Sequence, residues 1–167
     1  VALRAAEQFV KGAYAYRQKD AASLGLIIQK MAGERLIEAD RIGEGALRMC
    51  GNINRSLPTE TALLQSEAME SQLRSMLALL KSNDLLAEQC MKNATQLEEK
   101  AGYSYGPPSI VKPSYEMYGE WLLEKGRADE ALQQFTLALK FAPNRLHSVK
   151  GKLQAEKMMK ESSIALH

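Results

Sequence analysis

The chain has 167 residues, of which 46% are hydrophobic and 25% are charged, and its formal net charge is +2 at pH 7. These values are typical of a soluble globular protein with one compact domain. No apolar run approaches the roughly 18 residues that span a bilayer, which excludes a protein inserted in the membrane. Because the chain begins with Val1 and not with Met, we expect a trimmed or processed protein, and the sequence does not indicate its compartment.

Residues 1–56 predict a helical hairpin. Apolar residues at helical spacing indicate a first helix over about Leu3–Gln18 and, after a short turn, a second helix from Ala21. The glycines at 43, 45 and 51 each cost about 1 kcal/mol inside a helix, so we expect an extended or kinked helix and then a loop over Gly51–Leu57. The stripe predicted to be buried on the first helix consists of Leu3, Ala6, Phe9, Val10, Ala13 and either Tyr16 or Arg17.

Residues 57–101 predict a second hairpin. Thr59 offers an N-cap hydroxyl to a long helix that runs over Ala62–Leu80, and a turn at Asn83 precedes its partner over Leu85–Lys100. The segment Gly102–Pro113 follows with three prolines and two glycines, which excludes a helix there. Its last proline is expected just inside the start of the next helix.

The stretch Tyr115–Pro143 carries the most specific pattern, Y-E-M-Y-G-E-W-L-L-E-K-G-R-A-D-E-A-L-Q-Q-F-T-L-A-L-K-F-A-P. Large and small residues occupy set positions, because small side chains let two helices approach to about 8–10 Å while large ones fill the space between them. The positions are Tyr115, Tyr118, Gly119, Leu122, Gly126, Ala131, Phe135, Ala138 and Pro143. This pattern resembles a complete tetratricopeptide repeat (TPR), a helical hairpin that stacks on its neighbours and has no chemistry of its own.

The resemblance implies an all-α protein. TPR-like antiparallel hairpins would stack into a short right-handed solenoid, closed by an end helix over 144–167 that Asn144 caps. Residues 57–101 match a repeat in the second helix, where Ala87, Met91 and Ala94 stand, and depart from it at Ser71 and Glu99. The loop Y-G-P-P…V-K-P before a strong repeat is similar to that of a group of poorly characterised bacterial TPR proteins.

Residue types with catalytic or metal-binding chemistry are sparse. The two histidines, His147 and His167, stand in the last segment, and no HExxH, Walker-type or GxGxxG motif is present. Cys50 and Cys90 lack the close spacing of zinc ligands, so they predict two free thiols, or one disulfide in an exported protein. We therefore expect no enzyme, no cofactor and no metal.

The TPR resemblance implies a ligand groove lined by the first helix of each hairpin. Glu116 and Glu120 fall on or beside that face, where they would form an acidic wall for a basic peptide or would simply face solvent. The Lys, Asn and Arg that clamp chaperone tails in many TPR proteins are missing from these positions.

The preceding helix has its own candidates on the corresponding face. Met69, Gln72 and Met76 would either contact a peptide, since methionine adapts to varied apolar ligands, or pack against the first helices. Tyr103 and Tyr105 in the linker would lie over the groove or hold the loop in place.

The expected function is a scaffold that binds a protein or peptide, in particular a basic segment. Two alternatives remain open at this point: self-association into a homo-oligomer, and a helper role for a larger enzyme from which the chain was trimmed. The four lysines Lys150, Lys152, Lys157 and Lys160 of the last segment are expected to be a solvated helix face and not a nucleic-acid site, because no aromatic residues interleave with them.

Overall fold

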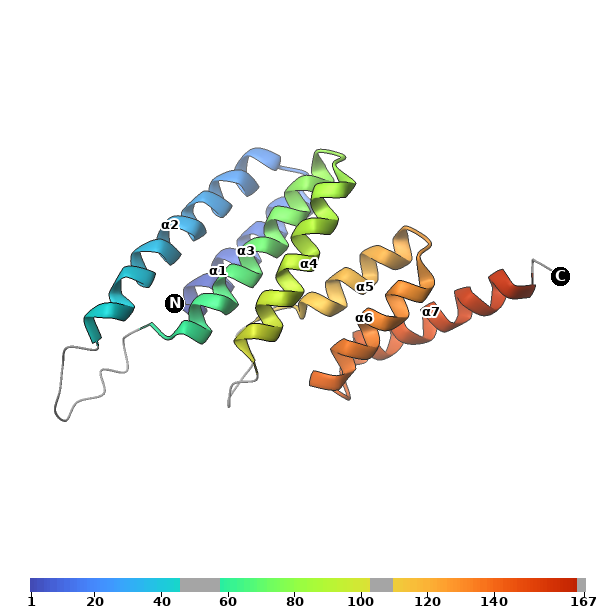
Figure 1. The fold of residues 1–167 in the computed structure, drawn as a ribbon. Coiled ribbons are helices and arrows are strands. Elements are labelled where there is room, and N and C mark those ends of the chain that lie inside the picture. Colours follow the sequence, from blue (N-terminus) through green and yellow to red (C-terminus); the bar gives the residue numbers. More distant parts are fainter. Residues whose placement is uncertain (46–57, 103–109, 165–167) are drawn as a thin grey trace. The chain divides into compact units, whose positions relative to one another are not determined.

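The computed structural model describes residues 1–45, 58–102 and 110–164. These residues form seven helices and no strand, so the prediction of an all-α protein is confirmed for the described part of the chain (Figure 1). The helices are α1 (Ala2–Arg17), α2 (Ala21–Gly45), α3 (Glu60–Leu80), α4 (Asp84–Ala101), α5 (Ser114–Glu124), α6 (Ala128–Phe141) and α7 (Leu146–Ile164). The chain divides into two compact units, Val1–Val111 and Lys112–His167, which we describe separately.

In the first unit α3 is the central helix. It packs against α1, α2 and α4, and Figure 1 shows consecutive helices running in opposite directions. Because three neighbours surround it, α3 buries residues on nearly every side, with Met69 and Leu73 fully buried. Leu24, Ile28 and Met31 of α2 and Ala87 and Met91 of α4 are also part of the buried core. A helix that is buried all round belongs to the interior of a helical stack.

Helix α1 turns a different face to the core from the one its apolar pattern predicts. Phe9 is buried as expected, but Leu3 is 85% exposed and Val10 is 56% exposed, so the predicted stripe is wrong at these two positions. The buried side chains beside Phe9 are Ala5, Gln8 and Ala15. The reason is close packing at Gly12, where an added Cβ would lie 2.6 Å from the Leu73 side chain. The smallest residues of α1 therefore face α3, because only they allow this approach.

Two alanine substitutions should have opposite effects in this hairpin. We expect Gly12→Ala to lower the free energy of unfolding by about 1–3 kcal/mol, because its Cβ overlaps the buried Leu73 side chain. Gly25→Ala should raise it by about 0.5–1 kcal/mol, because no atom lies within 4 Å of its Cβ position and alanine favours a helix. Urea unfolding followed by circular dichroism measures both, and a stabilising Gly12→Ala would contradict the packing described here.

Local signals place the remaining ends of the helices in this unit. The Thr59 hydroxyl accepts a hydrogen bond from the Ala62 backbone N–H at 3.1 Å, as its N-cap prediction requires. The side chain of Asn83 caps α4 in the same way through the Leu86 N–H. Helix α2 continues through both Gly25 and Gly33 to Gly45. The predicted loop over Gly51–Leu57 lies outside the described residues.

The second unit is built around Phe135 of α6. Its fully buried ring lies against two glycines, and an added Cβ would approach it to 2.9 Å from Gly119 of α5 and to 2.3 Å from Gly151 of α7. Ala131 is also fully buried, and Gly126 has a φ of +74° in the turn between α5 and α6. These placements match the large, small and turn positions expected from the sequence.

Two helix starts in this unit differ by a residue or two from expectation. Pro113 is the N-cap of α5 and not its first helical residue, and its carbonyl accepts the Met117 N–H. Helix α7 begins at Leu146, and the Arg145 carbonyl accepts the Val149 N–H, so Arg145 and not Asn144 stands at the cap position. Short polar residues beside a helix start compete for the cap, and sequence patterns place such ends only to within a residue or two.

Candidate functional site

The candidate ligand contacts on α3 are buried inside the first unit. Met69 is 0%, Gln72 1% and Met76 9% exposed. Of the two interpretations that the sequence left open for these residues, packing against neighbouring helices is the one that fits their burial. Tyr103 and Tyr105 lie outside the described residues.

Glu116 is buried in an internal ion pair. It is 2% exposed, and its carboxylate accepts hydrogen bonds from Arg145 Nε at 2.7 Å, from Arg145 Nη2 at 3.0 Å and from the Ser148 hydroxyl at 2.6 Å. This two-pronged contact joins the first turn of α5 to the start of α7. The placement corrects the expected acidic groove wall, since a buried carboxylate that Arg145 neutralises presents no free charge to a peptide.

The pKa of Glu116 shows which effect prevails in this ion pair. Burial raises the pKa of the carboxyl, but the hydrogen bonds from Arg145 and Ser148 and the positive charges of Arg145 and Lys112 together outweigh burial. The pKa of Glu116 therefore lies below its ordinary value, and the group is ionised at neutral pH. The ion pair therefore contributes to the stability of the fold at neutral pH.

Glu120, the second predicted acidic contact, is partly exposed. Its side chain is 40% exposed, and its carboxylate accepts a hydrogen bond from the Lys112 ammonium group, which is itself 31% exposed. An ion pair in contact with solvent is worth about 0–1 kcal/mol. Of the two predicted glutamates, only this one is within reach of an external partner.

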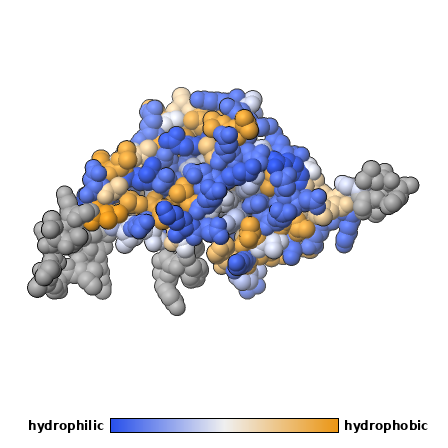
Figure 2. All heavy atoms as spheres, in the orientation of Figure 1, coloured by the Kyte–Doolittle hydropathy of each residue, from blue (hydrophilic) through white to orange (hydrophobic). Residues whose placement is uncertain are grey.

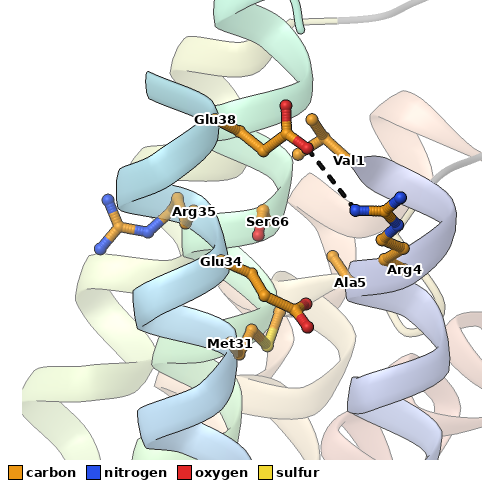
Figure 3. A pocket seen from close by; sticks show the side chains of 8 residues that line it. All are labelled: Val1, Arg4, Ala5, Met31, Glu34, Arg35, Glu38 and Ser66. Atoms are coloured by element: carbon orange, nitrogen blue, oxygen red, sulfur yellow. Dashed lines mark ion pairs between the residues drawn. The ribbon is translucent and has the colours of Figure 1, made fainter. Parts of the chain in front are cut away.

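A network of charged side chains holds α2 on α3. Glu70 is 3% exposed and accepts hydrogen bonds from Arg35 of α2 at 3.2 Å and from Arg74 at 2.9 Å. Nearby, a small pocket of about 10 Å³ opens between α1, α2 and α3, where Arg4 faces Glu38 at 3.7 Å (Figure 3). That volume suits about one water molecule, so this pocket is too small for an organic ligand.

A larger and more open pocket of about 410 Å³ lies within the second unit, lined by Gly126, Arg127, Ala128, Asp129, Glu130, Met159 and Ser162. The described residues are otherwise poor in groups for metal or thiol chemistry. They contain no group of three or more His, Cys, Asp and Glu side chains that could hold a metal ion. Cys90 is a free thiol, and its pKa is raised by partial burial; Cys50 lies outside the described part of the chain. Among the described helices, none is long and apolar enough to cross a membrane.

A surface of a different kind lies on the first hairpin. Seven large apolar side chains of α1 and α2 are exposed, of which Leu36 and Ile42 stand apart from the rest. The other five are Leu3 (85%), Val10 (56%), Tyr14 (65%), Leu26 (67%) and Ile37 (66%). Apolar surface along α2 is visible at the left of Figure 2. We call the surface formed by these five residues the outer face.

All five residues point away from α3. Gly12 of α1 faces Leu73 of α3, and at 100° per residue Leu3, Val10 and Tyr14 stand about 160–180° around the helix from it. On α2, Arg35 contacts Glu67 and Glu70 of α3, and Leu26 and Ile37 stand about 160–180° from it in the same way. The two stripes therefore belong to one side of the hairpin.

The order of residues along this face follows from the antiparallel packing. The Arg4–Glu38 ion pair and the short turn after Arg17 determine which residues of α1 and α2 lie at the same height. Leu3 then lies level with Ile37, and Tyr14 lies level with Leu26. The outer face thus has an apolar pair at each end, with Val10 between them.

The middle of the outer face is charged. Glu7 and Lys11 form an ion pair at 2.6 Å with both side chains more than half exposed. The hydrogen bond and the charge of Lys11 lower the pKa of Glu7, and the charge of Lys30 on α2 adds to this. Lys30 stands one helical turn after Leu26, on the same side of α2. Lys30 is 59% exposed. Lys30 also pairs with Glu34 of its own helix at 3.9 Å. Two acidic and two basic groups therefore lie between the two apolar ends.

Sequence reasoning missed the outer face because it assigned Leu3 and Val10 to the core. A usable signal was present, since α1 carries apolar residues on two opposite sides, with Phe9 on one and Leu3 and Val10 on the other. A helix with two apolar sides is typical of a position between two neighbours. Among the residues of the first unit that the structure describes, only one of these sides is covered.

Comparison with known proteins adds no relative. No family model, no curated protein and no solved structure matches this chain.

Proposed function

We propose that this chain is a non-catalytic protein-interaction module built from TPR-type helical hairpins, and that it binds another protein chain through the outer face. The observation that carries the proposal is the exposure of Leu3, Val10, Tyr14, Leu26 and Ile37 on one side of the α1–α2 hairpin. Large apolar side chains that gather on one side of a hairpin are typical of an interaction site. Covering such surface gains about 25 cal/mol per Å² removed from water.

Two features of the packing support a repeat architecture. The Phe135 ring lies against Gly119 at the spacing of a TPR hairpin, and α3 packs on both helices of the hairpin before it, as a stacked repeat does. In such a stack, each hairpin covers the apolar side of its neighbour, and an uncovered terminal side requires another partner. Within the described residues, the outer face is an uncovered side of this kind.

The proposal predicts that a partner depends on the outer face. The tagged chain is used to retain proteins from an extract of its source, with an untagged copy of the chain included among the possible partners. We expect a protein retained by the wild type to be lost when Val10→Glu and Tyr14→Glu are combined, because two buried charges at an interface weaken binding by several kcal/mol. Mass spectrometry identifies and quantifies what is retained.

A matched control makes the result specific. Leu85→Glu changes a leucine that is 71% exposed on α4, away from the outer face, and should leave retention unchanged. Circular dichroism of all variants checks that they are folded. If the outer-face variant retains every protein as well as the wild type, or if wild type retains neither its own copy nor any other protein, the proposed function is wrong.

A further inference from the structure

We propose that the partner bound by the outer face is a second copy of this chain, so that two α1–α2 hairpins pack face to face about a two-fold axis. This inference rests on the proposed function and names its partner. It stands on the arrangement of the apolar ends and charged middle of the outer face, and on the size of that face.

The apolar ends are complementary under a two-fold rotation. The two-fold axis lies in the plane of the outer face, passes through its centre and runs across the two helices. Rotation about it reverses the ends of the hairpin, so the Leu3 and Ile37 end of one copy meets the Tyr14 and Leu26 end of the other. Each apolar end is then covered by an apolar end. An interface of this kind uses the same patch on both copies, which is the commonest symmetry of soluble homo-oligomers.

The charged middle is complementary under the same rotation. Glu7 lies near the centre of α1, and Lys11 of the same helix pairs with it at 2.6 Å. Lys30 stands one turn after Leu26 on the same side of α2, where it pairs with Glu34 at 3.9 Å. When the copies pack with their directions reversed, Glu7 of each copy meets Lys11 or Lys30 of the other. Opposite charges in these positions favour the reversed register, and a shifted register would bring like charges together.

The size of the face suits a reversible dimer. Helix α1 has 16 residues, and at a rise of 1.5 Å per residue it is about 24 Å long. Two helices side by side are about 20 Å wide. The outer face therefore covers roughly 500 Å² per copy, or about 1,000 Å² for the pair, which is the lower limit for a specific interface. We infer a dimer that dissociates on dilution.

Light scattering coupled to gel filtration tests the inference on the full chain. Over about a hundredfold range of concentration, the mass should rise from that of one chain of 18.5 kDa toward that of two. Combining Val10→Glu with Leu26→Glu should weaken dimerisation by at least about a hundredfold, because each substitution places a charge in the apolar contact. Leu85→Glu on α4 is the matched control and should leave the dissociation constant unchanged.

A charge exchange tests the register itself. Glu7→Lys in one preparation, and Lys11→Glu with Lys30→Glu in another, should each weaken self-association by about tenfold or more, because each variant brings like charges together across the axis. An equimolar mixture of the two should form a mixed dimer with close to wild-type affinity. Isotope-labelled copies in native mass spectrometry distinguish the mixed dimer from either homodimer.

The outcomes separate this inference from the proposed function. A monomer at every concentration, or a dimer that survives Val10→Glu with Leu26→Glu, overturns the inference. A monomeric wild type can still retain a different protein that the variant combining Val10→Glu with Tyr14→Glu fails to retain. In that case the proposed function stands and the inference of a dimer does not. Failure of the charge-exchanged mixture to associate overturns the two-fold register.

Discussion

Phe135→Ala is expected to lower the free energy of unfolding of the second unit by about 3–5 kcal/mol. The ring is fully buried and fills the space that Gly119 and Gly151 leave open, so truncation produces a cavity that rigid helices on both sides cannot close. Trp121 of α5 is the single tryptophan of the chain and belongs to this unit. Urea unfolding followed by its fluorescence therefore reports on the surroundings of α5 in the second unit.

The two glycines provide the control for this packing. Gly151→Ala should cost about 1–3 kcal/mol in the wild type, because its Cβ would lie 2.3 Å from the Phe135 ring. Combined with Phe135→Leu, the same substitution should cost much less, since the smaller side chain leaves room for it. Additive effects would contradict a direct contact. Leu137→Ala on the exposed side of α6 should change stability by less than about 1 kcal/mol.

Arg145→Met is expected to have an effect of similar size, about 3–5 kcal/mol. The substitution retains most of the apolar stem of the side chain but removes both guanidinium hydrogen bonds. The Glu116 carboxylate then stays buried without its arginine and keeps the hydrogen bond from the Ser148 hydroxyl. Adding Glu116→Gln should recover most of the loss, because a neutral amide is far less costly to bury than a charge. Trp121 fluorescence again reports the unfolding of this unit.

The pH dependence of stability gives an independent test of the ion pair. Because the folded state lowers the pKa of Glu116, its contribution is present above the unfolded value of 4.5 and is lost as the pH falls through the lower folded value. The wild type should therefore lose stability below about pH 4.5, and Arg145→Met should lose less there because protonation neutralises its buried carboxyl. A parallel pH profile for the two proteins would show that Glu116 and Arg145 do not interact.

Local sequence signals predicted the helices and their ends well. The N-cap at Thr59, the turns before α2 and α4 and the helix-free ends of the linker follow from interactions between residues a few positions apart. The spacing of Gly119, Ala131 and Phe135 predicted their burial as well. These residues lie on two consecutive helices of one hairpin, so the contact between them is also close in the sequence.

The sequence by itself determined that the chain is all-α and built of helical hairpins, and it determined which residues pack inside the last hairpin. These features depend on interactions between residues that are close together in the sequence. Tertiary structure alone decided the site. Leu73, sixty-one positions from Gly12, selected the side of α1 that faces the core, and thereby exposed Leu3 and Val10. Arg145, 29 positions from Glu116, turned a predicted ligand contact into a buried ion pair. Both outcomes depend on packing between distant segments, where the close approach of small residues and the cost of burying a lone charge outweigh the local apolar pattern.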